Sequence, residues 1–314
     1  MPPRKKKAKI EKEEVKQEEK NEEAVDEEDE NEEDEDEVDS DADLLEAQTD
    51  EQMEFNFEAF PVEKRDKEGI QNMLTQIFLR PEIDTSSIAD AVIAENPMGT
   101  VIGPADEEAD DEDLETNSVF GLVTIIPLEL NKQESPAFAN IVQEYIMARI
   151  GKIDNKEKTK LIEDKLKQPN VGLFINERML QFPYQVVPPT FGCFRTELPK
   201  FKRNYDTIIY IHKIRKSGDS SEEGKKKKKK QKATEASASK TEAILYDNQE
   251  DEFITTLSAG KLDYVDVPVH MDVSASSKFH STTLNDTKYL AYRRIAVMDR
   301  KRFDAFTKQT SESA

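Results

Sequence analysis

The sequence predicts an α/β fold in which helices flank one mixed central sheet. Short runs rich in Val, Ile, Phe and Tyr alternate with segments whose apolar residues recur every three or four positions. Strands and helices that alternate in this way pack as layers around one hydrophobic core. Most of the excess charge lies outside these runs, so the near-neutral remainder is long enough to form that core. We therefore expect one α/β domain at 55–308, between tails at 1–54 and 309–314.

The expected strands are short and rich in β-branched or aromatic residues. They lie at 55–60, 119–126, 171–175, 205–214, 243–246, 266–271 and 289–298. The expected helices show helical spacing of apolar residues or stand between capping residues and prolines. They lie at 66–78, 86–95, 136–150, 157–167, 184–198, 248–257 and 299–306.

The first of these helices shows how the boundaries are chosen. Asp66 caps its start, and Pro81 stops it. Its apolar residues share one face and are Ile70, Met73, Leu74, Ile77 and Phe78. Part of this face, together with Leu79, also matches the spacing of a leucine-rich nuclear export signal. The inner face of an amphipathic helix is the favoured interpretation.

The net charge of −22 belongs to appendages of the domain. Residues 1–58 hold 26 acidic against 8 basic residues, and a second run at 106–115 holds 8 acidic residues in ten positions. Residues 1–54 contain too few apolar side chains to offset the entropy of ordering, so we expect a disordered acidic tail. The acidic run is expected to form an exposed loop at 105–116. A Ser/Lys-rich insertion at 216–241 is of low complexity and is also expected to be disordered.

A basic cluster near the N-terminus is typical of a nuclear localisation signal. Its residues are Arg4, Lys5, Lys6, Lys7 and Lys9. A second lysine run at 225–230 favours import as well, although both clusters are also consistent with solvated charge. The sequence contains no run of about 18 apolar residues, so no membrane span is predicted. The polar N-terminus lacks the apolar stretch of a secretory signal. We expect a nuclear protein, with nucleolar residence and shuttling to the cytoplasm as finer alternatives.

The residue types that catalysis and cofactor binding need form no recognisable site in the sequence. No two glycines stand two positions apart, which excludes the Gly-x-Gly phosphate loops that bind dinucleotides or coenzyme A, and there is no P-loop. His212, His270 and His280 have no partner at metal-ligand spacing, and His212 is expected to be a core or edge histidine. The lone Cys193 is expected to be a buried thiol on a helix. Enzymatic function is therefore disfavoured, and we predict no catalytic residue, metal or cofactor.

The acidic runs have two interpretations. They are either solvated, self-repelling segments that keep the protein soluble, or mimics of nucleic-acid charge that mask a basic partner such as a ribosomal protein or a histone. The density of the charge and its occurrence in two runs favour a basic partner. The candidate contact residues in the second run are Asp106, Glu107, Glu108, Asp110, Asp111, Glu112 and Asp113. Direct binding of nucleic acid is disfavoured because the excess negative charge would repel phosphates.

Several motifs between residues 55 and 306 resemble the BCCIP/BCP family. They are Phe57-Glu-Ala-Phe-Pro61, Asp66-x-x-Gly69-Ile70, Val119-Phe-Gly-Leu-Val123, Val171-Gly-Leu-Phe-Ile-Asn-Glu-Arg178, Pro183-x-Gln185-x-x-Pro188, Ala243-Ile-Leu-Tyr246 and Glu250-x-Glu252-Phe253. The stretch that begins at Val171 is the most specific of them. The resemblance covers nearly all of the expected domain, and the lysine-rich insertion fits it too.

The resemblance implies a nuclear protein whose domain is GNAT-like, that is, similar to an acetyltransferase but without evident catalysis. It implies a chaperone or adaptor for a large-subunit ribosomal protein in ribosome biogenesis and nuclear export, with contacts to import and export receptors. Two alternatives remain: a cell-cycle and DNA-repair scaffold for recombination or kinase-inhibitor proteins, and a residual acyl-CoA-dependent acyltransferase. Asn176, Glu177 and Arg178 are expected just past a strand end, as candidate partner-binding residues or, as favoured, a charged turn that fixes the next helix.

Overall fold

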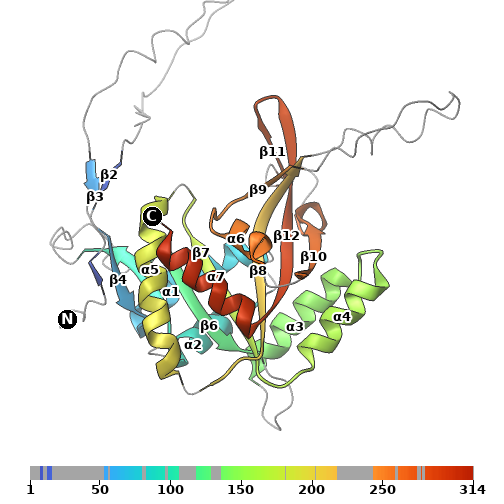
Figure 1. Cartoon of the computed structure of the whole chain (residues 1–314), viewed down its shortest axis with the longest axis horizontal. Helices are drawn as coiled ribbons and strands as arrows, with labels where there is room; N and C mark the ends of the chain where they lie inside the picture. The colour runs from blue at the N-terminus through green and yellow to red at the C-terminus, as the bar shows by residue number, and fades with distance from the viewer. Residues whose placement is uncertain are drawn as a thin grey trace, which may run out of the picture.

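The computed structural model describes the α/β domain and parts of the N-terminal segment. The described residues are 8–9, 13–15, 53–55, 57–79, 83–95, 98–105, 118–128, 136–180, 182–201, 203–217, 243–258, 261–273, 277 and 280–313. They form a mixed central sheet of ten strands with helices on both of its faces (Figure 1). The predicted α/β class is therefore confirmed, whereas the GNAT-like assignment stays a prediction.

The sheet follows the order β1-β4-β5-β6-β7-β8-β12-β10, with β9 beside β8 and β11 beside β12. Its strands are β1 (Ala8–Lys9), β4 (Phe57–Pro61), β5 (Thr100–Pro104), β6 (Gly121–Pro127), β7 (Val171–Arg178), β8 (Thr207–Ser217), β9 (Ile244–Tyr246), β10 (Asp263–Pro268), β11 (Ser281–Leu284) and β12 (Thr287–Asp299). Only β7 and β8 run parallel; the other described pairs are antiparallel. A separate pair is formed by β2 (Glu13–Val15) and β3 (Met53–Phe55).

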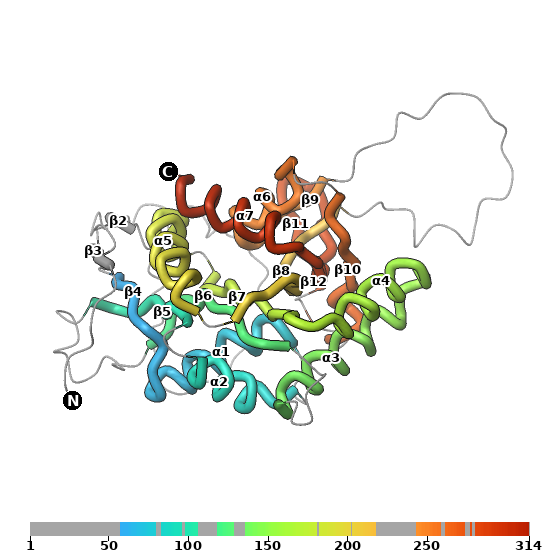
Figure 2. Tube along the Cα trace, turned by 60° about the horizontal axis from the view of Figure 1, so that its bottom comes forward, coloured from blue at the N-terminus to red at the C-terminus, as the bar shows by residue number. Residues whose placement is uncertain are grey.

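Two sets of helices cover the two faces of the sheet (Figure 2). One face carries α1 (Lys67–Phe78), α2 (Thr85–Ala94), α3 (Ala137–Ile150) and α4 (Lys156–Leu166). The other face carries α5 (Val187–Glu197), α6 (Asp251–Thr256) and α7 (Arg300–Glu312). Short 3-10 turns complete the chain at η2 (Lys64–Asp66), η4 (Tyr184–Val186), η5 (Leu198–Lys200) and η6 (Val269–Met271). None of the helices in these ranges is long and apolar enough to cross a membrane.

Alternating side chains of the central strands serve the two cores. Leu173 of β7 packs with the core under α1 to α4, whereas its neighbour Phe174 packs with Phe191, Phe303 and other rings of the opposite core. This alternation is what a strand buried on both faces produces. The apolar face predicted for α1 is confirmed, since all five of its residues are buried. Asp66 behaves differently from the prediction: it accepts a hydrogen bond from the Glu63 amide, within η2 rather than within α1.

Several predicted boundaries need correction. Strands β5 and β11 were not predicted. The strand expected at 266–271 is β10, which ends at Pro268 because proline has no amide hydrogen to donate, and η6 follows it. Helix α7 continues to Glu312, so 309–314 is mostly helix instead of tail: Thr310 is buried one turn after Phe306. Where disorder was expected in 1–54, β1, β2 and β3 are strands; the rest of 1–52, the acidic run at 106–117 and the insertion at 218–242 lie outside the described residues.

Candidate functional site

Strands β7 and β8 are hydrogen-bonded to each other only over their first halves. The parallel pairing runs from Val171 opposite Thr207 to Phe174 opposite Tyr210. Beyond that point β7 pairs with β6, and β8 pairs with β9 and β12. The carboxyl ends of parallel strands are the usual place for a site in an α/β sheet. Here polar side chains replace apolar ones at that place.

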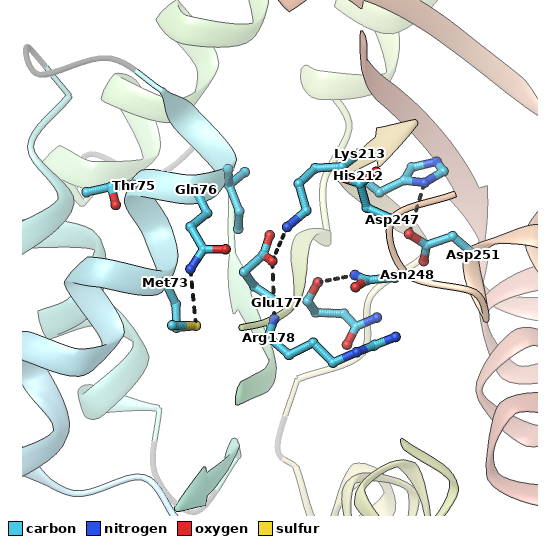
Figure 3. Close-up of polar contacts among 12 residues, drawn as sticks. Met73, Thr75, Gln76, Glu177, Arg178, His212, Lys213, Asp247, Asn248 and Asp251 are labelled. Carbon is cyan, nitrogen blue, oxygen red and sulfur yellow. Dashed lines mark hydrogen bonds and ion pairs between the residues drawn. The ribbon is translucent and has the colours of Figure 1, made fainter. Parts of the chain in front are cut away.

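The segment 247–251, between β9 and α6, joins the two diverging strands. The Asp247 amide donates to the Lys213 carbonyl of β8 at 3.3 Å. The Asn248 side chain donates to the Asn176 carbonyl of β7 at 3.2 Å. Asn176 in turn donates through Nδ2 to Glu250 Oε1 at 2.8 Å. We call this set of residues, together with the side chains described next, the β7–β8 polar network (Figure 3).

On the α6 face, Arg178 and Glu250 form an ion pair with two contacts. Arg178 Nη1 lies 2.5 Å from Glu250 Oε1, and Nη2 lies 3.0 Å from Oε2. Burial alone would lower the pKa of the Arg178 guanidinium, but the Glu250 carboxylate outweighs that effect and raises the pKa above its usual range. The Arg178 guanidinium therefore keeps its charge, although its partner Glu250 has no exposed surface.

Next to this pair, Tyr210 and His212 of β8 both contact Asp251. The Tyr210 hydroxyl donates to Asp251 Oδ1 at 2.9 Å, and His212 Nδ1 lies 3.2 Å from Oδ2. Burial raises the pKa of the Asp251 carboxyl, against the opposing influence of His212. Burial, reinforced by the charge of Asp251, raises the pKa of the Tyr210 phenol well above its usual range. A carboxylate, an imidazole and a phenol could exchange protons, but all three are buried, so a reactant has no access to them. The prediction of a core histidine at 212 is confirmed.

On the opposite face, Glu177 and Lys213 form an ion pair that points across the gap between the strands (Figure 3). Burial raises the pKa of the Glu177 carboxyl, while Lys213 and Arg293 oppose that rise. Arg293 of β12 donates to the carbonyls of Ile77 at 3.0 Å and Gln76 at 2.7 Å. Both carbonyls lie in the last turn of α1, where backbone acceptors have no partner within the helix and a cation is favourable. The network thus fixes α1 to the sheet.

The position predicted for Asn176, Glu177 and Arg178 was wrong. They were expected past a strand end, yet they lie inside β7, and each is at most 8% exposed. The prediction ended the strand at Ile175 because the apolar run ends there. Their partners Lys213 and Glu250 are 36 and 72 residues away in the chain, so no local pattern reveals that these polar groups are satisfied internally. For the same reason the sequence placed Glu250 only in a family motif, without a role as a partner, and did not single out Asp251.

The other predicted residues fall elsewhere. The acidic residues at 106–113 and the basic residues at 4–7 lie outside the described residues, and Lys9 lies in β1. Cys193 lies on a helix as predicted, but it is half-buried instead of buried. Across the described ranges, no group of three or more His, Cys, Asp or Glu side chains could hold a metal ion.

The described geometry can be set beside known proteins. The model of the BCCIP family matches residues 52–254. The "Protein BCCIP homolog" of Caenorhabditis elegans is 40% identical over 282 residues, which are 83% of this chain and 80% of that protein. The human "BRCA2 and CDKN1A-interacting protein" is 28% identical over 152 residues, or 48% of each chain. The crystal structure of BCP1 from Saccharomyces cerevisiae is 17% identical with a TM-score of 0.47, and covers 84% of this chain and 91% of that one. The chain belongs to the BCCIP family.

Proposed function

We propose that the protein is a non-enzymatic nuclear binding protein that acts as chaperone or adaptor for a basic client. The proposed client is a large-subunit ribosomal protein, and the proposed processes are ribosome biogenesis and nuclear export. The observation that carries the proposal is the separation of charge in the chain. The acidic excess lies at 1–58 and 106–115, whereas the polar side chains of the β7–β8 network are engaged with one another.

The β7–β8 polar network supports binding over catalysis. Its titratable groups are buried and bonded to one another, so they are not available to activate a substrate. They instead fix α1, α6 and the two strands as one rigid unit. A rigid domain is a suitable platform for charged segments that bind a partner.

Charge pairing between acidic segments and a basic client makes binding sensitive to salt. Exposed charges are screened at high ionic strength, so the client should bind at low salt and be released as salt rises. Client capture from nuclear lysate on the immobilised protein, followed by mass spectrometry, tests the proposal. The matched control replaces the seven acidic residues at 106–113 with Asn or Gln, which keeps their size. If the wild-type protein returns no ribosomal or other basic protein at low salt, the proposal fails.

A second candidate is a scaffold for cell-cycle and DNA-repair proteins. It is favoured by the printed name of relatives, BRCA2 and CDKN1A-interacting protein. The same capture experiment separates the two functions. Enrichment of recombination or kinase-inhibitor proteins that survives high salt and neutralisation of 106–113 would favour the scaffold over the escort of a basic client.

A residual acyl-CoA-dependent acyltransferase is the alternative from another class. A GNAT-like domain would be consistent with acyltransferase activity. However, segment 247–251 contacts both β7 and β8 where the strands part, so this end of the strands is bridged by the chain itself. Titration with coenzyme A in a calorimeter tests this alternative. Stoichiometric heat would restore it, and no heat would dismiss it.

Nuclear placement is part of the proposal and rests on the basic cluster at 4–9. Replacement of Arg4, Lys5, Lys6 and Lys7 by alanine should move a fluorescent fusion from the nucleus to the cytoplasm if an import receptor reads this cluster. Unchanged nuclear accumulation would remove the cluster from the proposal.

A further inference from the structure

Two of the exposed large hydrophobic side chains stand next to each other. Among the described residues these side chains are Met179, Leu180 and Leu284, which are 44%, 70% and 48% exposed. Met179 and Leu180 lie in the turn that follows β7, closed by a hydrogen bond from the Phe182 amide to the Met179 carbonyl at 3.2 Å. Contact between an exposed apolar pair and water is unfavourable, so burial of the pair against a partner would be favourable.

Three half-buried aromatic rings support this turn. The ring of Phe57 lies 5.6 Å from that of Phe120 and 4.7 Å from that of Phe182, and the rings of Phe120 and Phe182 are 6.0 Å apart. The Met179 amide donates to the Phe120 carbonyl at 2.9 Å, which ties the turn to the rings. We call these five residues the apolar turn patch: Phe57, Phe120, Met179, Leu180 and Phe182. Because backbone bonds and ring contacts fix it, a ligand would find it already formed.

Both acidic segments of the chain join the domain at this patch. The N-terminal acidic segment leads into Phe57 at the start of β4. Phe57 pairs with Pro104, two residues before Asp106, where the second acidic run begins. That run leads back to Phe120, whose amide donates to the Ile102 carbonyl at 2.8 Å. The chain that leads into Phe57 holds 25 acidic residues at 1–56, and the chain between Ala105 and Phe120 holds the 8 acidic residues of 106–115.

We propose that the apolar turn patch is the docking site for a basic segment of the client that carries bulky apolar side chains. Met179 and Leu180 bury the apolar side chains, and the excess negative charge of the chain, −22, attracts the flanking Lys and Arg. The inference rests on the proposed binding of a basic client and identifies the surface that binds it. The two parts act differently: charge speeds encounter and depends on salt, while apolar contact slows release.

Two labelled peptides serve as probes of this site. One is rich in lysine and arginine and contains leucines; the other is matched but has serines in place of the leucines. Fluorescence anisotropy would measure both against the full chain. We expect the wild-type protein to bind the leucine peptide about tenfold more tightly than the serine peptide, which corresponds to about 1.4 kcal/mol. The double variant Met179→Ser/Leu180→Ser should lose that preference, whereas Leu284→Ser, a change of another exposed leucine on the β11–β12 hairpin, should keep it.

The outcomes separate the docking site from the proposed function. If the double variant binds the leucine peptide as tightly as the wild type does, the docking site is wrong, while capture of basic proteins by the wild type would leave the function standing. If the wild type binds neither peptide and captures no basic protein, both fail. The single variant Leu180→Ser, at a site 70% exposed, guards against loss of fold and should weaken binding in the same direction. If sedimentation shows a wild-type dimer that the double variant does not form, the patch is an interface between two copies of this chain, and the proposal is overturned.

Discussion

Arg178 at the end of β7 is paired in two-contact geometry with Glu250 just before α6, and the pair lies inside the protein. The Arg178 side chain is 8% exposed and the Glu250 side chain has no exposed surface. Glu250 also accepts from Asn176 at 2.8 Å, so both of its oxygens are engaged. Such a pair contributes little compared with an apolar pair, but each partner depends on the other, because a lone buried charge is costly.

This dependence predicts a large effect for single substitutions of the pair. Arg178→Met or Glu250→Met should each lower the free energy of unfolding by about 3–5 kcal/mol, because the remaining charge stays buried without its partner. The double variant Arg178→Met/Glu250→Met should recover much of that loss. Urea unfolding of the wild type, the two single variants and the double variant gives the interaction free energy of the pair as a double-mutant cycle. Arg300→Met, which breaks the exposed pair with Asp304, is the control and should leave stability nearly unchanged. Losses that simply add would contradict the proposed dependence.

Tyr210 should contribute through its hydroxyl as well as its ring. Tyr210→Phe keeps the ring but removes the donor to Asp251 at 2.9 Å. A buried carboxylate that loses a donor costs about 1–3 kcal/mol, so the thermal midpoint should fall by several degrees. Tyr246→Phe is the matched control, since its hydroxyl bonds to Thr255 at the exposed surface, and it should have little effect. Equal midpoints for the two variants would show that the Tyr210–Asp251 bond is not stabilising.

Ionisation of the Asp266 carboxyl should make the free energy of unfolding depend on pH. Burial alone would raise the pKa of its carboxyl, but bonds from Arg294 and Lys216 outweigh burial and lower the pKa below 3.8. A carboxyl whose pKa is lower in the folded state stabilises fully above 3.8, and that contribution is lost as the pH falls through the folded pKa. Asp266→Asn should therefore be less stable than wild type near neutral pH, with a deficit that shrinks in acid. Unfolding measured across the acidic range checks the slope; a deficit independent of pH would contradict it.

Asp251 should show the opposite slope, because burial raises the pKa of its carboxyl in the folded state. The folded protein then binds the proton more tightly than the unfolded chain does, so stability falls as the pH rises from 3.8 through the folded pKa. Relative to Asp251→Asn, the wild type should lose stability over that window. If the wild type instead gained stability relative to Asp251→Asn as the pH rose, the direction assigned to the pKa of this carboxyl would be wrong.

The sequence predicted those parts of the fold that local patterns determine. Helix α1 is an example: its buried face follows from the spacing of five apolar residues. Helix α7 was predicted too short because its last turns bury threonines, such as Thr307 and Thr310, instead of large apolar residues. Strand β7 was cut at Ile175 because polar residues begin there. The local pattern does not reveal that Glu250, far along the chain, accepts hydrogen bonds from Asn176 and Arg178.

The site shows the same division. The absence of a glycine phosphate loop and the core position of His212 could be inferred from the chain alone. The β7–β8 polar network could not, because it is held together by contacts between residues far apart in the chain, such as Lys213 with Glu177 and Tyr210 with Asp251. Polar residues in a buried strand require partners. That rule says that Asn176, Glu177 and Arg178 need partners if the strand continues, but it does not say which.

Two glycines, Gly172 in β7 and Gly192 in α5, should respond oppositely to replacement by alanine. A Cβ at Gly172 in β7 would lie 2.9 Å from Ile125 Cδ1 and from two ring atoms of Tyr205, both of which are buried and cannot move freely. Gly172→Ala should therefore destabilise the protein by about 1–3 kcal/mol through overpacking. A Cβ at Gly192 in α5 would have no atom within 4 Å, so Gly192→Ala should stabilise by about 0.5–1 kcal/mol, because alanine loses less backbone entropy in a helix. Denaturant midpoints of the two variants against wild type measure both shifts. A stable Gly172→Ala protein would mean that β7 is packed less tightly against Tyr205 than the distances indicate.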